Sequence, residues 1–266
     1  MAKQQPLTNP ISPLAGAGFF LRGLKGIWNP ALFPYVAIPL LINLTLFASG
    51  TWWLADAFGG LMDKWLPEMP SWLAWLESLI WGLFGVVILV VVYYSFTLIA
   101  NLVAAPFNSF LAEKAEYLLT GQKPAFEEPV AVQIRRAIGS ELRKLLYILS
   151  RMIPMAIVSL ILMFIPAVNA AVPVLWFLFS AWLLANEYLD YTLGNHGLMF
   201  PQVRDFSTAR RAGALGFGGA VTLATSIPIL NLFVMPAAVV GGTHFVVASR
   251  NNSSEQTSGQ PAQALQ

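Results

Sequence analysis

Long runs without charged residues alternate with short charged segments along this chain. The four longest uncharged runs lie between Lys25 and Asp56, Glu77 and Glu113, Arg151 and Glu187, and Arg211 and Arg250. About 20 apolar helical residues cross a hydrocarbon core of ~30 Å, and each charge at its centre costs about 2.5–3.5 kcal/mol. The pattern therefore predicts an all-α integral membrane protein, with residues 1–250 forming a single membrane domain.

The first two runs predict two long transmembrane helices. Residues 34–55 give the first span, with Trp52 and Trp53 at one end, where aromatic side chains favour the membrane interface. The second run is too long for one perpendicular span and too short for two. We expect one long helix over 78–112, tilted or projecting beyond the bilayer, that bends near Ala105 and Pro106.

Residues 113–151 differ from the runs on either side because they hold seven basic and five acidic side chains. Apolar side chains at Leu142, Leu145, Leu146, Ile148 and Leu149 lie among the charges. This mixture is typical of amphipathic helices in water, and we expect a cytoplasmic amphipathic helical segment here.

A short internal repeat links the last two runs. Both contain the pattern Ile-Pro-x-[Val/Leu]-Asn-x-x-Val, at 165–172 and 227–234, followed by another proline at 173 and 236. Each run is longer than one span and shorter than two. The repeat favours two re-entrant helical hairpins, over 152–186 and 212–249, each with a Pro/Asn turn. Two ordinary spans kinked by proline remain the alternative.

The basic residues predict the orientation. Residues 56–77 hold Lys64 against four acids, whereas basic residues match or outnumber acids near the other membrane ends. By the positive-inside rule, 56–77 lies outside, and the N-terminus and both hairpins lie on the cytoplasmic side. Residues 1–13 form a polar N-terminal tail without a signal-peptide layout, and 251–266 are expected to be a disordered C-terminal tail.

Composition and motifs exclude several functions. The chain has no cysteine, and 11% of its residues are charged against about 25% in soluble domains. Its net charge of +2 is too small to indicate nucleic-acid binding. Motifs for ATP binding, serine hydrolases and zinc proteases are absent, so we expect no catalytic residue, metal site or cofactor.

Arg22-Gly23-Leu24-Lys25 is the strongest candidate binding site. Two basic side chains flank a glycine just before the first span. If a helix begins here, its free N–H groups and positive dipole end favour an anion, and a tetrahedral oxyanion suits the arrangement. The alternative is a positive-inside anchor that contacts lipid phosphates.

Other polar residues are candidates for a permeation pathway, namely Asn108, Glu113, Asn169 and Asn231. Glu113 is the acid nearest the long apolar helix, and it either lines a pathway or marks where that helix leaves the membrane. His244 lies in an apolar stretch, where it is either a proton carrier or a hydrogen-bonded buried imidazole.

Several motifs in one order resemble the CysZ family of bacterial sulfate permeases. The most specific is Ala104-Ala105-Pro106-Phe107-Asn108 followed by Leu111-Ala112-Glu113; the others are 38–43, 173–182, Asp190-Tyr191 with Asn195-His196, and 227–236. The resemblance covers roughly residues 18–249. It implies two long transmembrane helices, two hemi-penetrating hairpins and a homo-oligomer, either a dimer or a larger assembly.

The resemblance also implies a function. Such proteins take up sulfate across the bacterial inner membrane for cysteine synthesis without an ATPase. The family's Gly-Leu-Arg sulfate motif corresponds to Gly23-Leu24-Lys25. Here lysine replaces the arginine, so a compact ammonium stands in place of a planar guanidinium that can donate two hydrogen bonds to one oxyanion. We weigh this permease hypothesis against a non-transporting scaffold or regulator of another transporter, for which 113–151 would dock a partner. A membrane-embedded enzyme has no nucleophile–base pair to support it.

Overall fold

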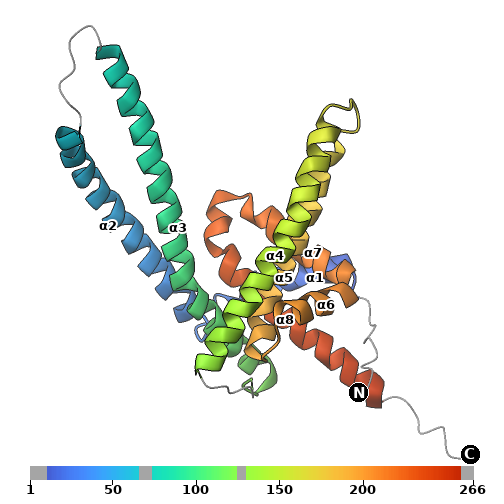
Figure 1. Cartoon of the computed structure of the whole chain (residues 1–266). Helices are drawn as coiled ribbons and strands as arrows, with labels where there is room; N and C mark the ends of the chain where they lie inside the picture. The colour runs from blue at the N-terminus through green and yellow to red at the C-terminus, as the bar shows by residue number, and fades with distance from the viewer. Residues whose placement is uncertain (1–10, 66–73, 125–129, 259–266) are drawn as a thin grey trace, which may run out of the picture. The chain divides into compact units, whose positions relative to one another are not determined.

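The computed structural model describes residues 11–65, 74–124 and 130–258, and every regular element within them is an α-helix. Figure 1 shows the elements in chain order. They are α1 (Pro13–Gly26), α2 (Phe33–Trp65), α3 (Ala74–Thr120), α4 (Val130–Met163), α5 (Ala171–Asn195), α6 (Phe200–Ala209), α7 (Arg211–Thr225) and α8 (Pro228–Ser258). The expected all-helical fold class is confirmed.

The chain divides into two compact units. One comprises Pro34–Phe107 and the other Met1–Phe33 with Asn108–Gln266. The first unit holds most of α2 and the N-terminal part of α3, which continues through Pro106 without a break in helix. Large apolar side chains on α2 are exposed, Trp52 among them with 73% of its surface accessible. This pattern suits a lipid-facing helix.

Four helical segments in the described part of the chain are long and apolar enough to cross a membrane. They are Phe33–Gly50, Ile138–Met163, Ala171–Asn195 and Pro228–Arg250. The first contains most of the expected span 34–55. Together with the exposed apolar surface, these segments identify a membrane protein.

The larger unit has a core built from α1, α5, α7 and α8. Phe245 of α8 is fully buried at its centre. Its ring lies 5.3 Å from Phe19 of α1, 6.3 Å from Phe206 of α6 and 6.1 Å from Phe217 of α7, measured between ring centroids. Edge-to-face and tilted contacts at these distances are favourable. One aromatic side chain thus joins three other helices.

Glycines let the core helices approach at backbone distance. A Cβ added at Gly16 would collide with the carbonyl oxygen of Gly213, and one at Gly218 would collide with that of Ala181. These contacts bring α1 against α7 and α7 against α5. Lipid tails are as apolar as the helix surfaces, so the hydrophobic effect does not bring helices together within a membrane. Helices there commonly associate through small residues that let their backbones pack closely.

Two helical hairpins occupy the regions of the internal repeat. α4 and α5 meet through residues 164–170, and α7 and α8 through Ser226 and Ile227. The same backbone hydrogen bond occurs in both copies. The Asn169 N–H donates to the Ile165 carbonyl at 3.1 Å, and the Asn231 N–H donates to the Ile227 carbonyl at 2.8 Å. The two copies of the sequence repeat therefore share this hydrogen bond, although their linkers differ in length.

The hairpin arms are longer than the half-length helices that the sequence led us to expect. α4 has 34 residues and passes through Pro154, so most of the amphipathic segment and the first arm form one helix. Only α7, with 15 residues, is half-length. α8 continues to Ser258, so helix extends past Arg250, and residues 259–266 lie outside the described chain.

Candidate functional site

Arg22 and Lys25 lie on the last turns of α1. The helix buries one face through Gly16, Phe19, Phe20 and Gly23, while both basic residues are exposed. Residues three apart are neighbours on a helix surface, so the two cations share a side of α1. Within the described residues, neither has a carboxylate at salt-bridge distance. The pair is therefore open to an anion from outside the chain.

The premise that a helix begins at this motif is wrong. α1 starts at Pro13, where Ser12 caps it by accepting a hydrogen bond from the Ala15 N–H, and it ends at Gly26. The motif therefore lies at the negative end of the helix dipole, which favours the Lys25 cation and offers no free N–H groups to an anion. Any anion affinity here rests on the Arg22 and Lys25 side chains.

Gly23 has a packing role. A Cβ at this position would collide with the carbonyl oxygen of Ala237 on α8. The glycine therefore brings α1 against α8 and fixes the motif to the core. Arg22 stacks over the Phe19 ring, with Cζ 5.1 Å from its centroid, and His244 of α8 is partly buried. Leu24 is partly exposed between the two cations.

The other predicted pathway residues have contacts of their own. Asn108 is buried on α3, with Nδ2 3.4 Å from the Tyr191 hydroxyl oxygen of α5. Glu113 is partly exposed, 4.0 Å from the Lys123 ammonium. Asn169 and Asn231 are exposed at the two hairpin tips. In the described part of the chain, no hydrogen bond or ion pair links any of these four residues to Arg22 or Lys25.

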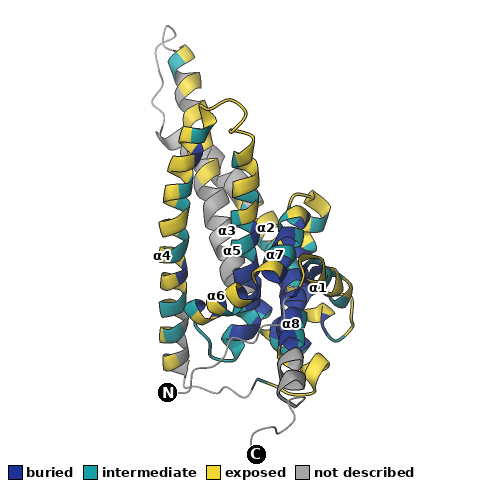
Figure 2. Ribbon diagram, turned by 90° about the vertical axis from the view of Figure 1, so that its right-hand side faces the viewer, coloured by how far each residue is buried: buried dark blue, intermediate teal, exposed yellow. Residues whose placement is uncertain are grey.

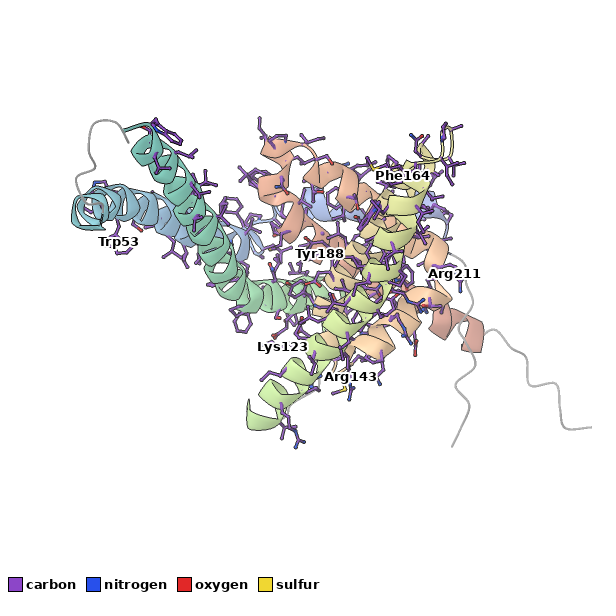
Figure 3. All side chains as sticks on the ribbon, turned by 45° about the horizontal axis from the view of Figure 1, so that its top comes forward. Trp53, Lys123, Arg143, Phe164, Tyr188 and Arg211 are labelled. Atoms are coloured by element: carbon purple, nitrogen blue, oxygen red, sulfur yellow. The ribbon has the colours of Figure 1, made fainter. Side chains whose placement is uncertain are left out.

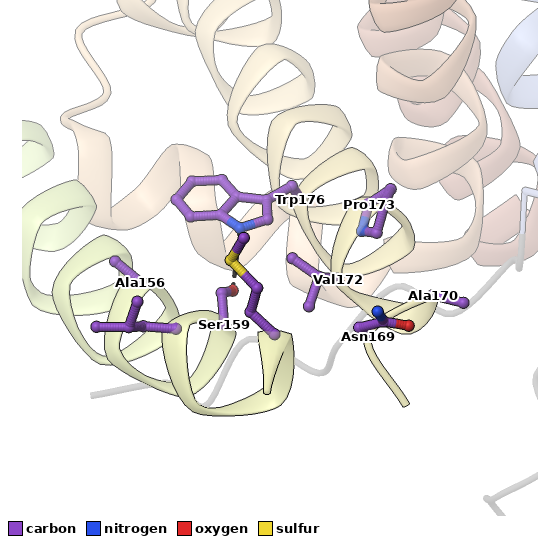
Figure 4. Close-up of a pocket in the computed structure, with 9 residues that line it drawn as sticks. Ala156, Ser159, Asn169, Ala170, Val172, Pro173 and Trp176 are labelled. Carbon is purple, nitrogen blue, oxygen red and sulfur yellow. Dashed lines mark hydrogen bonds between the residues drawn. The ribbon is translucent and has the colours of Figure 1, made fainter. Parts of the chain in front are cut away.

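A cavity of about 620 Å³ opens beside Asn169 at the tip of the α4–α5 hairpin. Figure 4 shows its mostly apolar lining, with the indole of Trp176 donating from Nε1 to the Ser159 hydroxyl at 3.0 Å. Met163 and Val172 contribute to the apolar walls. An apolar lining provides few hydrogen-bond donors and no positive charge to replace the water around an anion, so this cavity is a poor anion site.

Glu116, three residues after Glu113, is the buried acid that the sequence did not single out. Its side chain is only 4% exposed. His196 Nε2 lies 2.8 and 2.9 Å from its two carboxylate oxygens, and Arg250 donates from Nη1 to Oε1 at 2.8 Å. Asn195 also donates to the Ser109 carbonyl at 2.9 Å. The end of α5 and the C-terminal part of α8 around Arg250 are thus both tied to the same segment of α3.

A second charge cluster, built around the buried Lys144, joins α4 to α5. Lys144 donates from Nζ to Glu141 and to Glu187, each at 2.8 Å, and its own side chain is 11% exposed. The sequence placed Glu141 and Lys144 in the water-exposed amphipathic segment 113–151, and Glu187 at the end of an uncharged run. Nothing in their local spacing reveals the pairing of Lys144 with Glu187, because it depends on how the two helices pack.

Arg210 occupies the junction between α6 and α7. It is nearly buried, with its guanidinium 4.2 Å from the centre of the Phe206 ring. Burial lowers the pKa of Arg210, yet a guanidinium remains charged at any physiological pH. The aromatic face and the Phe206 carbonyl, 3.3 Å from Nη1, compensate this buried charge.

Comparison with known proteins assigns the family. The profile described as "Sulfate transporter CysZ/Etoposide-induced protein 2.4" matches residues 19–236, most of the chain. The chain belongs to this family. The resemblance seen in the sequence motifs is therefore confirmed.

Curated relatives match over nearly their whole lengths. The Sulfate transporter CysZ of Pseudomonas aeruginosa strain LESB58 is 40% identical over 237 residues, covering 88% of this chain and 95% of the relative. That of Pseudomonas fluorescens is 40% identical over 245 residues, covering 91% and 96%. That of Vibrio parahaemolyticus is 41% identical over 236 residues, covering 88% and 94%. This member of the CysZ family is thus similar to proteins named as transporters, not as enzymes.

Proposed function

We propose that this chain is a sulfate permease that takes up sulfate across the bacterial inner membrane for assimilation into cysteine. The main support is the full-length similarity to relatives named Sulfate transporter CysZ. The sequence has no ATP-binding motif, so the transport is independent of ATP hydrolysis by this chain. Transport is channel-like or weakly coupled to an ion.

Arg22 and Lys25 bind the sulfate in this proposal. The observation that carries it is two exposed cations on one side of α1 without a carboxylate partner in the described residues. Sulfate accepts charge-assisted hydrogen bonds from both side chains. Arg22 offers the planar fork that Lys25 lacks, which compensates for lysine at the family's arginine position. The competing interpretation is that the pair contacts lipid phosphates instead.

The hairpins belong to the same proposal. α4–α5 and α7–α8 enter the membrane from the cytoplasmic side, where the N-terminus also lies, and Asn108, Glu113, Asn169 and Asn231 line the route. Both hairpin tips are polar and exposed at Asn169 and Asn231, as a water-lined route requires. Two or more copies of the chain assemble in the bilayer, since each exposes long apolar helices.

The membrane potential opposes this uptake. A divalent anion entering a negative interior meets about 2.3 kcal/mol per charge for each 100 mV. A passive permease therefore works only if sulfate is consumed inside the cell, and a coupled one must carry a cation inward. A pH gradient distinguishes the two mechanisms.

The test is labelled-sulfate flux into liposomes that contain only the purified chain, with and without a pH gradient. We expect flux above that of empty liposomes. The Arg22→Ala/Lys25→Ala variant should lose sulfate binding and flux while still folding. The Arg135→Ala/Arg211→Ala variant removes the same charge from exposed positions elsewhere and should retain both. Equal flux in the two variants would reject the site without rejecting the transport function.

A non-transporting scaffold or regulator is the second candidate function. The observation that favours it is α4, whose apolar segment Ile138–Met163 exposes most of its large apolar side chains, which could contact a partner. A folded, correctly inserted protein that moves no sulfate would support this alternative.

A further inference from the structure

A stripe of aromatic and basic side chains runs along the membrane-proximal part of α4. Arg143, Tyr147 and Arg151 are four residues apart and share one face of the helix. Arg204 of α6 approaches the same ring, so the guanidinium carbons of Arg151 and Arg204 each lie 5.8 Å from the Tyr147 centroid. Two cations therefore gather around a single aromatic side chain.

Neighbouring helices fix this ring in place. Trp182 of α5 donates from Nε1 to the Tyr147 hydroxyl at 3.0 Å. The Phe200 ring at the start of α6 packs on Tyr147 with centroids 5.4 Å apart. Because three helices meet at Tyr147, the two arginines are anchored on a preorganised support.

Positive charge at the stripe exceeds negative charge. Arg204 contacts Asp205 at 3.0 Å, but this carboxylate is 70% exposed and the pair is a weak surface contact. In the described part of the chain, no carboxylate lies at salt-bridge distance from Arg143 or Arg151, and Arg143 contacts only the Met199 sulfur at 3.1 Å. The cluster therefore has capacity for an external anion.

The position of the cluster along α4 indicates where that anion comes from. Arg151 is the last charged residue before a charge-free run that extends to Glu187. Beyond it, Ile157, Leu160 and Ile161 are exposed, and Phe164 at the hairpin tip is 80% exposed. Figure 3 shows Arg143 and Phe164 toward opposite ends of the helix. Tyrosine and tryptophan at such a boundary mark the headgroup level of a bilayer.

We propose that Arg151 of α4 and Arg204 of α6 hold the phosphate of an anionic phospholipid beside the Tyr147 ring. Guanidinium groups match phosphate oxygens in a bidentate manner, and the acyl chains then lie along the exposed apolar face of α4 beyond Arg151. A lipid with an additional ammonium group, such as phosphatidylcholine, is less favoured because the cluster repels that cation. The site is separate from Arg22 and Lys25 and does not depend on sulfate transport.

Native mass spectrometry of the full chain in a mild detergent tests the proposal, with phosphatidylglycerol or phosphatidylcholine added at equal concentration. We expect more bound phosphatidylglycerol than phosphatidylcholine. The Arg151→Gln/Arg204→Gln variant should lose this binding by about tenfold or more, since each basic residue near a lipid surface contributes roughly a factor of five. The Arg135→Gln/Arg211→Gln variant, with the same net charge, should bind as the unchanged protein does.

Several outcomes would overturn the assignment. Equal retention of the two lipids by the unchanged protein would do so without any variant, even if the glutamine variant failed to fold. Equal losses in the two glutamine variants would show only a general charge effect. Displacement of phosphatidylglycerol by sulfate, but not by chloride at matched ionic strength, would assign the cluster to a free oxyanion.

The Arg151→Lys/Arg204→Lys variant keeps the charge and should retain an intermediate level of lipid.

Discussion

α4 and α8 are both apolar enough to cross a membrane, but the protein buries them very differently. In the candidate span Pro228–Arg250 of α8, 12 of the 23 residues are buried, whereas in Ile138–Met163 of α4 only Lys144 and Ser159 are. Figure 2 shows α8 dark blue over much of its length and α4 mostly yellow and teal. Apolar composition alone therefore does not determine which helix enters the core.

Residue size explains the difference. α8 carries Ala237, Ala238, Gly241 and Gly242, and its backbone approaches α1 and α5 there. A Cβ at Gly241 would lie 2.8 Å from the Phe19 carbonyl oxygen, and one at Gly242 would lie 2.7 Å from that of Tyr188. α4 instead presents leucine and isoleucine, which gain little from leaving lipid. In this fold, burial follows small residues and backbone contact.

The largest expected effect comes from adding volume inside the core. Gly218→Val places a branched side chain where the Ala181 carbonyl oxygen lies, so the backbone of α5 or α7 must move. We expect a loss of about 3 kcal/mol or more, or failure to fold. Thermal melting in detergent together with size-exclusion chromatography measures it.

Gly139→Ala on α4 is the matched control. Nothing lies within 4 Å of a Cβ added there, and alanine is the better helix former. We expect an unchanged or slightly higher melting temperature. Similar destabilisation at Gly139 and Gly218 would contradict the difference between the two helices.

The second effect is the loss of the buried ion pair that joins α4 to α5. Lys144→Met removes the charged hydrogen bond to Glu187, and we expect a loss of about 2 kcal/mol, because Glu187 is 39% exposed and water partly replaces its partner. Lys144→Met/Glu187→Met should recover most of it, because no unpaired charge then remains. Lys123→Met, which removes an exposed lysine 4.0 Å from Glu113, should change stability by less than about 0.5 kcal/mol. No recovery in the double variant would reject the pairing.

The third effect is at the end of α8. Glu116→Ala removes the carboxylate that accepts from Arg250, and His196 also loses its contact. We expect a loss of about 2 kcal/mol, since charged hydrogen bonds contribute roughly 1.5–3 kcal/mol. Hydrogen exchange at the last turns of α8 should rise. Glu113→Ala, three residues earlier and more exposed, should leave that exchange unchanged.

The smallest effect compares one aliphatic side chain on each helix. Val239 is fully buried on α8, and Leu160 is 61% exposed on α4. Val239→Ala should cost about 1–2 kcal/mol because its packing contacts are lost. Leu160→Ala should stay within about 0.5 kcal/mol, because lipid replaces the missing atoms. Equal costs would mean that α4 is packed as tightly as α8.

The sequence predicted the features of the fold that are encoded within a few neighbouring residues. Uncharged runs located the helices, and the repeated Ile-Pro-x-x-Asn located both hairpin turns. The motifs around Pro106 and Asn108 identified the family. These features were accessible because charge, proline and short motifs act within a few residues of the chain.

Features that depend on packing were not predicted. Glu116 and Glu113 have the same chemistry and lie one helical turn apart, so only the fold determines which of them meets Arg250. Lys144 likewise differs from its basic neighbours only through Glu187 on another helix. The helix start that would have favoured an anion at Arg22–Lys25 does not occur there, because Ser12 and Pro13 already begin α1 about three turns earlier.

The contact between Gly218 and the Ala181 carbonyl also limits which substitutions this protein can accept during evolution. A side chain blocked by another side chain is rescued by shrinking its neighbour, but every amino acid carries the same carbonyl group. No second substitution at Ala181 therefore makes room for alanine at Gly218. Random mutagenesis of that codon, followed by selection for folded protein, should recover glycine almost alone, whereas the codon for Gly139 should accept most residues.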